Sequence, residues 1–203
     1  TRVMALGQET GKDNWSAGFS IELPISGNKL KNSEMQWEAP TLVASEDVVL
    51  SADFKKVSAY DPRTGKELWW MPYEGCSLVG RPSYGNGMFY VVGSIKLDHH
   101  AVYAVRPGQG QLKTEQVAWQ NSVGMPHVPS PLLLGKELFV VKDSGTATCL
   151  DALTGKVVWK NRLGGNFRSS PIEVRGRIYV CSEEGKTLVL ATGRQFKVLA
   201  TNQ

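Results

Sequence analysis

Residues 48–69 (VVLSADFKKVSAYDPRTGKELW) and residues 138–159 (LFVVKDSGTATCLDALTGKVVW) decide the fold, because they are two copies of one pattern. The copies align without a gap when the first is moved by 90 positions, from 48 to 138. The identical positions are Asp53, Asp61, Thr64, Gly65, Lys66 and Trp69 against Asp143, Asp151, Thr154, Gly155, Lys156 and Trp159. Self-similarity at a fixed offset is typical of proteins that stack repeats of one supersecondary unit.

Weaker copies of the pattern flank these two. A shift of 40 positions places residues 138–150 on residues 178–190, although Leu199 stands where the terminal tryptophan of this last copy would be. Near the N-terminus, residues 5–15 have the spacing of residues 59–69. The repeat therefore extends over almost the whole chain.

One further copy is degenerate. It lies between residues 88 and 119 and carries insertions around residues 97–100 and 109–114. The terminal tryptophans of the copies that keep one are Trp15, Trp69, Trp119 and Trp159, at spacings of 40 to 54 residues. Strand-rich units of this length are typical of β-propeller blades.

Each unit is expected to form four short strands. In the copy that ends at Trp159, the expected strands are about 130–134, 137–142, 146–151 and 156–160. Asp, Ser and Gly favour tight turns, and they lie at 143–145 and 151–155. The fold is expected to be all-β, a partial propeller of about four full blades plus a half. The expected units are 1–20 (the half blade), 37–70, 80–120, 127–160 and 167–203.

The terminal tryptophans and the turn glycines are predicted to be structural anchors of the blades. An indole on an outer strand can lie between two blades and bury about 150–250 Å². Its N–H group needs an acceptor, and the Asp-x-x-Thr-Gly turn offers backbone carbonyls. A glycine in this turn allows a left-handed backbone conformation. The predicted anchors are Trp15, Trp69, Trp119, Trp159, Gly65 and Gly155.

Composition excludes several classes of protein. The 203 residues carry a net charge of +4, and the basic residues are scattered, whereas nucleic-acid binders concentrate positive charge on one face. No apolar run reaches the length of about 18–20 residues needed to span a bilayer. The chain begins at Thr1, so a leader could have been removed. The cysteines Cys76, Cys149 and Cys181 are odd in number, which argues against a disulfide framework but leaves one disulfide open.

The stretches Ala-Tyr-Asp-Pro-Arg-Thr-Gly-Lys-Glu-Leu-Trp (59–69) and Cys-Leu-Asp-Ala-Leu-Thr-Gly-Lys-Val-Val-Trp (149–159) resemble the tryptophan-docking motif of the quinoprotein (PQQ) repeat. Residues 170–187 and 196–202 are similar to BamB-like PQQ-repeat proteins. The resemblance covers about residues 3 to 201. It implies a PQQ-like β-propeller and a periplasmic or otherwise exported location. A ring of eight blades needs roughly 320 residues, so the chain is expected to be part of a longer propeller.

The resemblance implies two different functions, because the same blade occurs in enzymes and in scaffolds. A PQQ-dependent dehydrogenase would place PQQ on a tryptophan in the channel and hold Ca²⁺ with Glu, Asn and Asp. The chain has no adjacent cysteine pair and no Ca²⁺-binding run, so no catalytic, cofactor or metal residue is assigned. PQQ with calcium remains the alternative. His99 and His100, which follow Asp98, are interpreted as part of a solvated loop rather than metal ligands.

Partner binding fits the sequence better. Propellers present the residues before their innermost strands around a central channel. Aromatic and arginine residues, which are enriched in interface hot spots, occur at these positions. The candidate partner-binding residues are Trp37, Arg81, His127 and Arg168, with ordinary packing as the alternative.

The sequence therefore predicts a non-catalytic module that binds or scaffolds a protein or peptide, with self-association through open blade edges as a further expectation. The alternatives are the propeller of a PQQ-dependent dehydrogenase and an extracytoplasmic sensor domain.

Overall fold

A computed structural model describes residues 2–6, 13–18, 41–45, 47–52, 56–72, 80–96, 99–122 and 125–203. For residues 2–6, 13–18, 41, 94–96, 99 and 100 it describes the backbone alone. These residues form β-strands, turns and the single-turn 3₁₀ helix η1 (Thr114–Gln116), and no α-helix occurs among them. Trp15, as a side chain, and Trp37, Asp53 and Cys76 lie outside the described part.

The strands form one antiparallel pair and four larger sheets. The pair is a half blade of β1 (Arg2–Leu6) and β2 (Asp13–Gly18). Blade 1 contains β3 (Thr41–Ala44), β4 (Val49–Ala52), β5 (Lys56–Tyr60) and β6 (Glu67–Pro72). Blade 2 contains β7 (Ser83–Gly85), β8 (Met88–Lys96), β9 (His99–Val105) and β11 (Val117–Asn121). Blade 3 contains β12 (Leu132–Leu134), β13 (Glu137–Lys142), β14 (Thr146–Asp151) and β15 (Val157–Arg162). Blade 4 contains β16 (Ile172–Val174), β17 (Arg177–Cys181), β18 (Thr187–Ala191) and β19 (Val198–Asn202).

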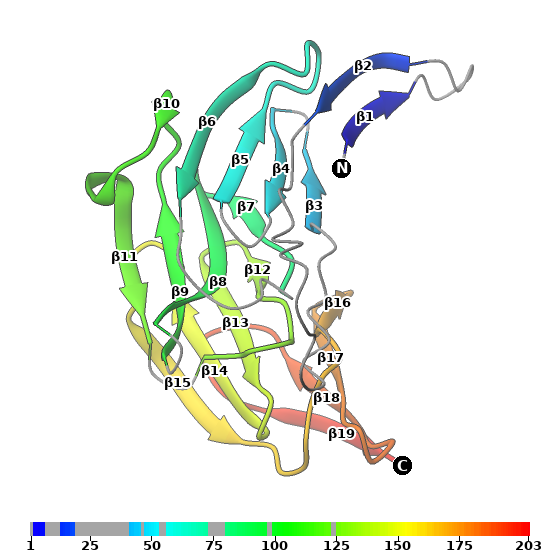
Figure 1. Cartoon of the computed structure of the whole chain (residues 1–203). Coiled ribbons are helices and arrows are strands. Elements are labelled where there is room, and N and C mark those ends of the chain that lie inside the picture. The colour runs from blue at the N-terminus through cyan, green and yellow to red at the C-terminus, as the bar shows by residue number, and fades with distance from the viewer. Residues whose placement is uncertain are drawn as a thin grey trace, which may run out of the picture.

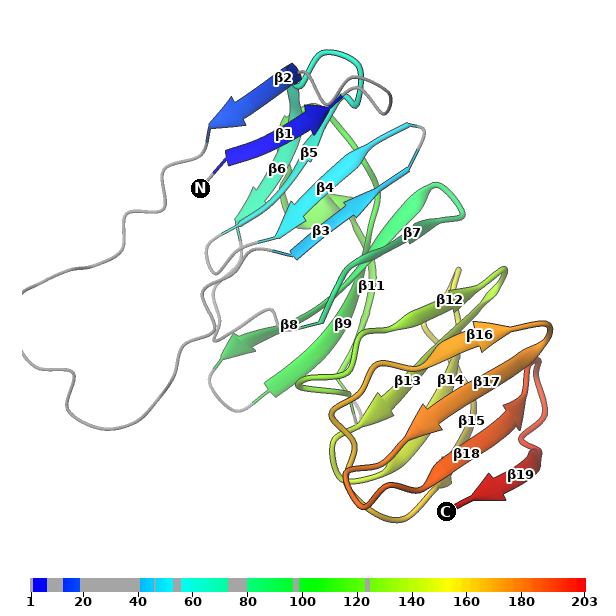
Figure 2. The same ribbon diagram turned by 90° about the vertical axis from the view of Figure 1, so that its right-hand side faces the viewer.

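The blades follow one another in chain order, as Figure 2 shows from the half blade to β19. Within each blade the first strand is innermost and the last strand is outermost, and the four strands pair antiparallel in sequence. Figure 1 shows the outer strands β6, β11 and β15 on one side of the arc and the inner strands on the other. The predicted all-β partial propeller is confirmed.

The strands expected for the copy that ends at Trp159 are found within two residues of their predicted bounds. The first strand begins two residues late, at Leu132, and the last strand ends two residues late, at Arg162. Pro131 has no N–H group to donate to a ladder, so the pairing starts after it.

The two Asp-x-x-Thr-Gly turns have the same geometry. Gly65 and Gly155 have φ of 71° and 70°, and each donates its N–H to the carbonyl of the aspartate four residues earlier at 2.8 Å. Asp61 Oδ1 accepts the N–H groups of Arg63 and Thr64 at 2.7 and 3.1 Å. A left-handed conformation at this point costs glycine little, which explains the residue type.

Apolar side chains from facing sheets meet in three layers, one between each pair of neighbouring blades from blade 1 to blade 4. Trp69 is 3% exposed and stacks on Phe89 of blade 2, with ring centroids 4.4 Å apart. Trp119 and Trp159 are half-buried, and their indole N–H groups donate to the next blade. The acceptors are the carbonyls of Ala152, at 2.9 Å, and Gly193, at 3.1 Å.

The insertion near residues 109–114 forms a strand that the sequence did not predict. β10 (Gly110–Gln111) lies in the connection between β9 and β11, but it pairs parallel with β6 of the preceding blade. Blade 1 therefore has five strands, with β10 outside β6.

The two described cysteines do not form a disulfide with each other. Cys149 is buried, and desolvation together with the nearby negative charge of Glu137 raises the pKa of its thiol to about 11. Cys181 is exposed. The thiolate is the reactive form, so Cys149 behaves as a small apolar core residue.

Candidate binding groove on the inner strands

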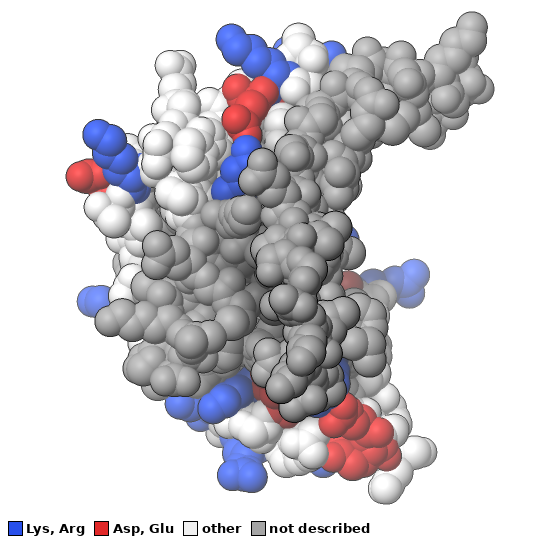
Figure 3. All heavy atoms as spheres, in the orientation of Figure 1, with Lys and Arg blue, Asp and Glu red and all other residues white. Residues whose placement is uncertain are grey.

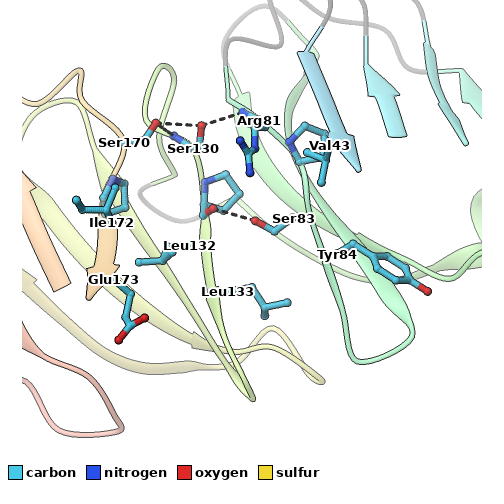
Figure 4. A pocket seen from close by; sticks show the side chains of 13 residues that line it. Val43, Arg81, Ser83, Tyr84, Ser130, Leu132, Leu133, Ser170, Ile172 and Glu173 are labelled. Atoms are coloured by element: carbon cyan, nitrogen blue, oxygen red, sulfur yellow. Dashed lines mark hydrogen bonds between the residues drawn. The ribbon is translucent and has the colours of Figure 1, made fainter. Parts of the chain in front are cut away.

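The first residues of the inner strands line a groove of about 590 Å³ on the concave side of the arc. The lining comes from all four full blades: Val43, residues 81–84, residues 130–133 and residues 170–173. In three of these segments the second residue is proline, as in Ser130-Pro131. The repeat thus brings equivalent positions of different blades to one surface (Figure 4).

A series of hydrogen bonds joins the blades at one end of the groove. The Arg81 backbone N–H donates to Ser130 Oγ at 2.9 Å, and the Ser130 N–H donates to Ser170 Oγ at 3.0 Å. Ser170 Oγ also donates to Ser130 Oγ at 3.0 Å, and Ser83 Oγ donates to the Pro131 carbonyl at 2.9 Å. Ser130 Oγ and Ser170 Oγ each accept a backbone N–H of the preceding blade, and Ser83 Oγ donates to a backbone carbonyl of the following blade. These bonds fix the inner strands relative to one another.

Opposite charges lie at the two ends of the groove (Figure 4). Arg81 is exposed, and its guanidinium forms no ion pair with any described residue. Glu173 lies at the other end, where its Oε1 accepts the Gly176 N–H at 2.6 Å. Between them the lining is aliphatic, including Leu132, Leu133 and Ile172, the last of which is 57% exposed. The groove combines an exposed cation that forms no ion pair with a described residue, hydroxyls and apolar surface.

Of the four predicted partner-binding residues, only Arg81 lines this groove. His127 is exposed, and its backbone N–H donates to Asp143 Oδ2 at 2.7 Å. Arg168 Nε lies 2.6 Å from Glu183 Oε1 in an exposed ion pair. Trp37 lies outside the described residues.

Sequence reasoning missed Ser130, Ser170 and Glu173 as lining residues. The recurrence of Ser-Pro at 130 and 170 is visible in the sequence and marks the starts of two inner strands. It does not show that the hydroxyls of one blade reach the backbone of the previous blade, because that contact depends on how the blades are stacked.

On the face that Figure 3 presents, the described Lys and Arg side chains do not form one continuous patch. Figure 3 shows Lys and Arg side chains at separate places on the face it presents, with Asp and Glu side chains among them. No helix of the described part is long and apolar enough to cross a membrane.

The described residues do not fit a stacked quinone with a calcium ion. The described tryptophans lie on β6, β11 and β15, the outer strands, whereas the groove contains Tyr84 as its aromatic residue. Glu173 is its lone carboxylate, and this group is already bonded to Gly176. Within the described ranges no group of three or more His, Cys, Asp or Glu side chains could hold a metal ion.

Radially stacked four-stranded sheets with a tryptophan on the outer strand define a PQQ-repeat β-propeller. Comparison with protein families agrees: a family model described as outer membrane protein assembly factor BamB matches residues 1–113 and 98–195. The chain belongs to this family.

Two curated proteins are similar to the chain. Outer membrane protein assembly factor BamB of Shewanella oneidensis is 27% identical over 170 residues, which cover 79% of this chain and 38% of that protein. Tetrathionate hydrolase of Acidithiobacillus ferrooxidans is 26% identical over 158 residues, which cover 66% of this chain and 31% of that protein. The chain thus spans about a third of the length of these relatives.

Two solved structures share the fold. BamB from Moraxella catarrhalis has a TM-score of 0.63 at 18% identity, with 80% of this chain and 48% of that chain covered. A quinohemoprotein alcohol dehydrogenase from Pseudomonas putida has a TM-score of 0.61 at 15% identity, with 80% of this chain and 33% of that chain covered. Because an assembly factor and a dehydrogenase are about equally similar, these likenesses show the fold and do not select a function.

Proposed function

We propose that this chain is part of a non-catalytic propeller that binds an extended segment of a partner protein in the inner-strand groove. The observation that carries the proposal is the exposed guanidinium of Arg81, which pairs with no described carboxylate and lies at one end of an aliphatic groove that also contains serine hydroxyls. The family description, an assembly factor for outer membrane proteins, supports a scaffold that handles other polypeptides. It also supports an exported location for the whole protein.

The chemistry of the groove suits an extended peptide. A peptide backbone needs hydrogen-bonding groups, which Ser130 and Ser170 provide, and aliphatic side chains need apolar contacts, which Leu132 and Ile172 provide. An acidic group of the peptide would meet Arg81, which can donate two parallel hydrogen bonds to a carboxylate. The separation of Arg81 from Glu173 would favour one direction of the peptide over the other.

The test uses a dye-labelled peptide of alternating valine and threonine that ends in aspartate. We expect Arg81→Ala to weaken its binding about tenfold in fluorescence anisotropy, since a charge-assisted hydrogen-bonded pair is lost. Arg168→Ala is the matched control because this arginine lies outside the groove and pairs with Glu183. We expect it to change the affinity less than about twofold. Equal losses in both variants, or no binding by the unmodified chain, would count against the groove.

The alternative function, the propeller of a PQQ-dependent dehydrogenase, is supported by the fold likeness to the quinohemoprotein enzyme. It is distinguished by adding PQQ and Ca²⁺ to the chain. A saturable change in PQQ absorbance that survives Arg81→Ala would favour the dehydrogenase. An unchanged spectrum together with peptide binding would favour the scaffold.

A further inference from the structure

The chain contains its own example of strand addition to an outer blade edge. β10 pairs parallel with β6, with Gly110 beside Trp69 and Gln111 beside Trp70. The next residue, Leu112, donates its N–H to the Trp70 carbonyl at 2.7 Å. Its side chain is 3% exposed and belongs to the apolar layer between blades 1 and 2. An outer strand of this propeller can therefore accept a short extended segment that has an aliphatic residue after the paired positions.

The equivalent edge of blade 2 has no such cover in the described part of the chain. The repeat aligns Trp119 with Trp69, so Gln120 of β11 takes the place of Trp70. β11 is the end strand of its sheet. The connection that could cover it, between β14 and β15, is the tight turn at 151–155 and contributes no strand.

The turn of blade 3 lies against β11 and leaves apolar surface beside it. Trp119 Nε1 donates to the Ala152 carbonyl, and Asn121 Nδ2 donates to the Gly155 carbonyl at 2.8 Å. In the same segment Leu153 is 44% exposed and Val157 is 46% exposed. Large aliphatic side chains at this exposure, next to the end strand of a sheet in the described part of the chain, provide a contact for an aliphatic residue of an added strand.

Charge distinguishes β11 from the next outer strand. At the position of Trp70, β15 carries Lys160, and Arg162 follows on the same strand; both are exposed. Edge lysines oppose the addition of another strand. β11 reads Val-Ala-Trp-Gln-Asn and carries no charge, so it lacks this protection.

We propose that the outer edge of β11 binds an extended, uncharged segment of another protein in parallel orientation. The segment imitates residues 110–112: its backbone pairs with Gln120, and an aliphatic side chain at the third position packs on Leu153 and Val157. This site lies on the outer strands and shares no residue with the inner-strand groove, so either proposal can fail without the other.

The probe is a synthetic peptide with blocked termini that copies residues 107–112 (PGQGQL) and so carries no charge, with a photoreactive phenylalanine analogue in place of Gln109. After irradiation with the complete chain, mass spectrometry locates the cross-link. We expect cross-links to β11. Cross-links mainly to β6 or β15, or none above a scrambled peptide, would overturn the proposal.

Two variants of the chain test the backbone pairing. Gln120 aligns with Trp70, whose carbonyl accepts the Leu112 N–H on the side away from the sheet, so we expect the Gln120 N–H to face outward as well. Gln120→Pro would remove this N–H at an edge position where proline is tolerated. Gln120→Ala removes the side chain and keeps the N–H. We expect the proline variant to reduce the cross-link yield about tenfold and the alanine variant to change it less than about twofold. Equal yields in the two variants would overturn the proposal.

A change in the peptide keeps the test valid if the proline variant fails to fold. N-methylation of the leucine that corresponds to Leu112 removes the donor to the Gln120 carbonyl and leaves the protein unmodified. We expect the methylated peptide to lose about as much cross-linking as Gln120→Pro. Full cross-linking by the methylated peptide would show contact through side chains alone and would contradict strand addition.

Discussion

The contact between blades 1 and 2 differs from the contacts between blades 2 and 3 and between blades 3 and 4, although the same tryptophan position forms all three. Trp69 is almost fully buried and stacks on Phe89. Trp119 and Trp159 are half-buried and donate hydrogen bonds to carbonyls of the following blade. One repeat position therefore stabilises the propeller in two ways, by burial in the first contact and by a hydrogen bond in the others.

The length of the next connection accounts for the difference. Residues 106–116 of blade 2 are long enough to send β10 and Leu112 over the rim of blade 1, where Leu112 joins the apolar layer that contains Trp69. The corresponding connection of blade 3 is the tight turn at 151–155, and it offers a carbonyl instead. The surroundings of a repeat position are thus set by the following blade.

The comparison predicts unequal losses of stability. We expect Trp69→Ala to lower the free energy of unfolding by about 4 kcal/mol, because it removes a buried ring and leaves a cavity between two blades. Trp159→Ala is expected to cost roughly half as much, since its ring is partly hydrated in the native chain and less area is lost. Urea unfolding followed by circular dichroism measures both.

If both variants lost the same free energy of unfolding, the greater burial of Trp69 would not make its contact more stabilising than that of Trp159. A larger loss for Trp159→Ala would assign the greater stabilisation to the indole hydrogen bond and would reverse the comparison.

The second prediction concerns Gly155, which lies directly against the ring of Trp119. A Cβ added at Gly155 would lie 2.5 Å from Trp119 Cδ2, and φ is +70°. We expect Gly155→Ala to cost about 3 kcal/mol, from the left-handed backbone and from displacement of the indole. Gly185→Ala is the matched control, because φ is +83° and nothing lies within 4 Å of the added Cβ. It should cost about 1–2 kcal/mol in the same unfolding experiment.

The two glycine variants separate backbone strain from blade contact. If they lost the same stability, the close approach of Trp119 would contribute nothing and the contact between blades 2 and 3 would tolerate a shift. Gly155→Ala could also be tested in a chain that carries Trp119→Ala. If its additional loss of stability over Gly185→Ala disappeared there, that additional loss would come from contact with the indole.

The repeat predicts the fold because its turn residues determine where the strands of each blade begin and end. Asp143, Gly145 and the turn at 151–155 define where strands end, and the strands of blade 3 follow within two residues. β10 could not be predicted in this way. It forms because an insertion in one blade pairs with the edge strand of another blade. The sequence of the inserted residues has no pattern that indicates this distant partner.

The candidate site was less predictable than the fold. Arg81 lies just before the inner strand β7 and lines the groove, whereas its role in partner binding stays a prediction. Arg168 and His127 were expected beside it, but Glu183 pairs with Arg168, and Asp143 holds the backbone of His127. These carboxylates come from hairpins of the same blades, so the arginine and histidine identities alone could not indicate which side chain stays free.

The smallest expected effect concerns the aspartates of the two Asp-x-x-Thr-Gly turns, whose contribution to the stability of the chain depends on pH. Hydrogen bonds from the backbone N–H groups of Arg63 and Thr64 lower the pKa of Asp61 below 3.8. Burial opposes the same shift at Asp151, but hydrogen bonds from Thr154 and Arg194 outweigh it and also lower that pKa.

A carboxylate with a lowered pKa in the folded chain stabilises it fully above the unfolded value near 3.8, and this contribution is lost as the pH falls through the folded pKa. We therefore expect Asp61→Asn and Asp151→Asn to lower the melting temperature at pH 7 and to match the unmodified chain more closely near pH 3. Of these two described aspartates, Asp151 is the one that pairs with an arginine of the next blade: Arg194 Nη1 lies 3.2 Å from Asp151 Oδ2 and 3.7 Å from Glu137 Oε1. Added salt should consequently shrink the effect of Asp151→Asn more than that of Asp61→Asn. Equal salt dependence of the two variants would mean that the Arg194 ion pair does not contribute to the contact between blades 3 and 4, and that the hydrogen bond from Trp159 acts there without electrostatic support.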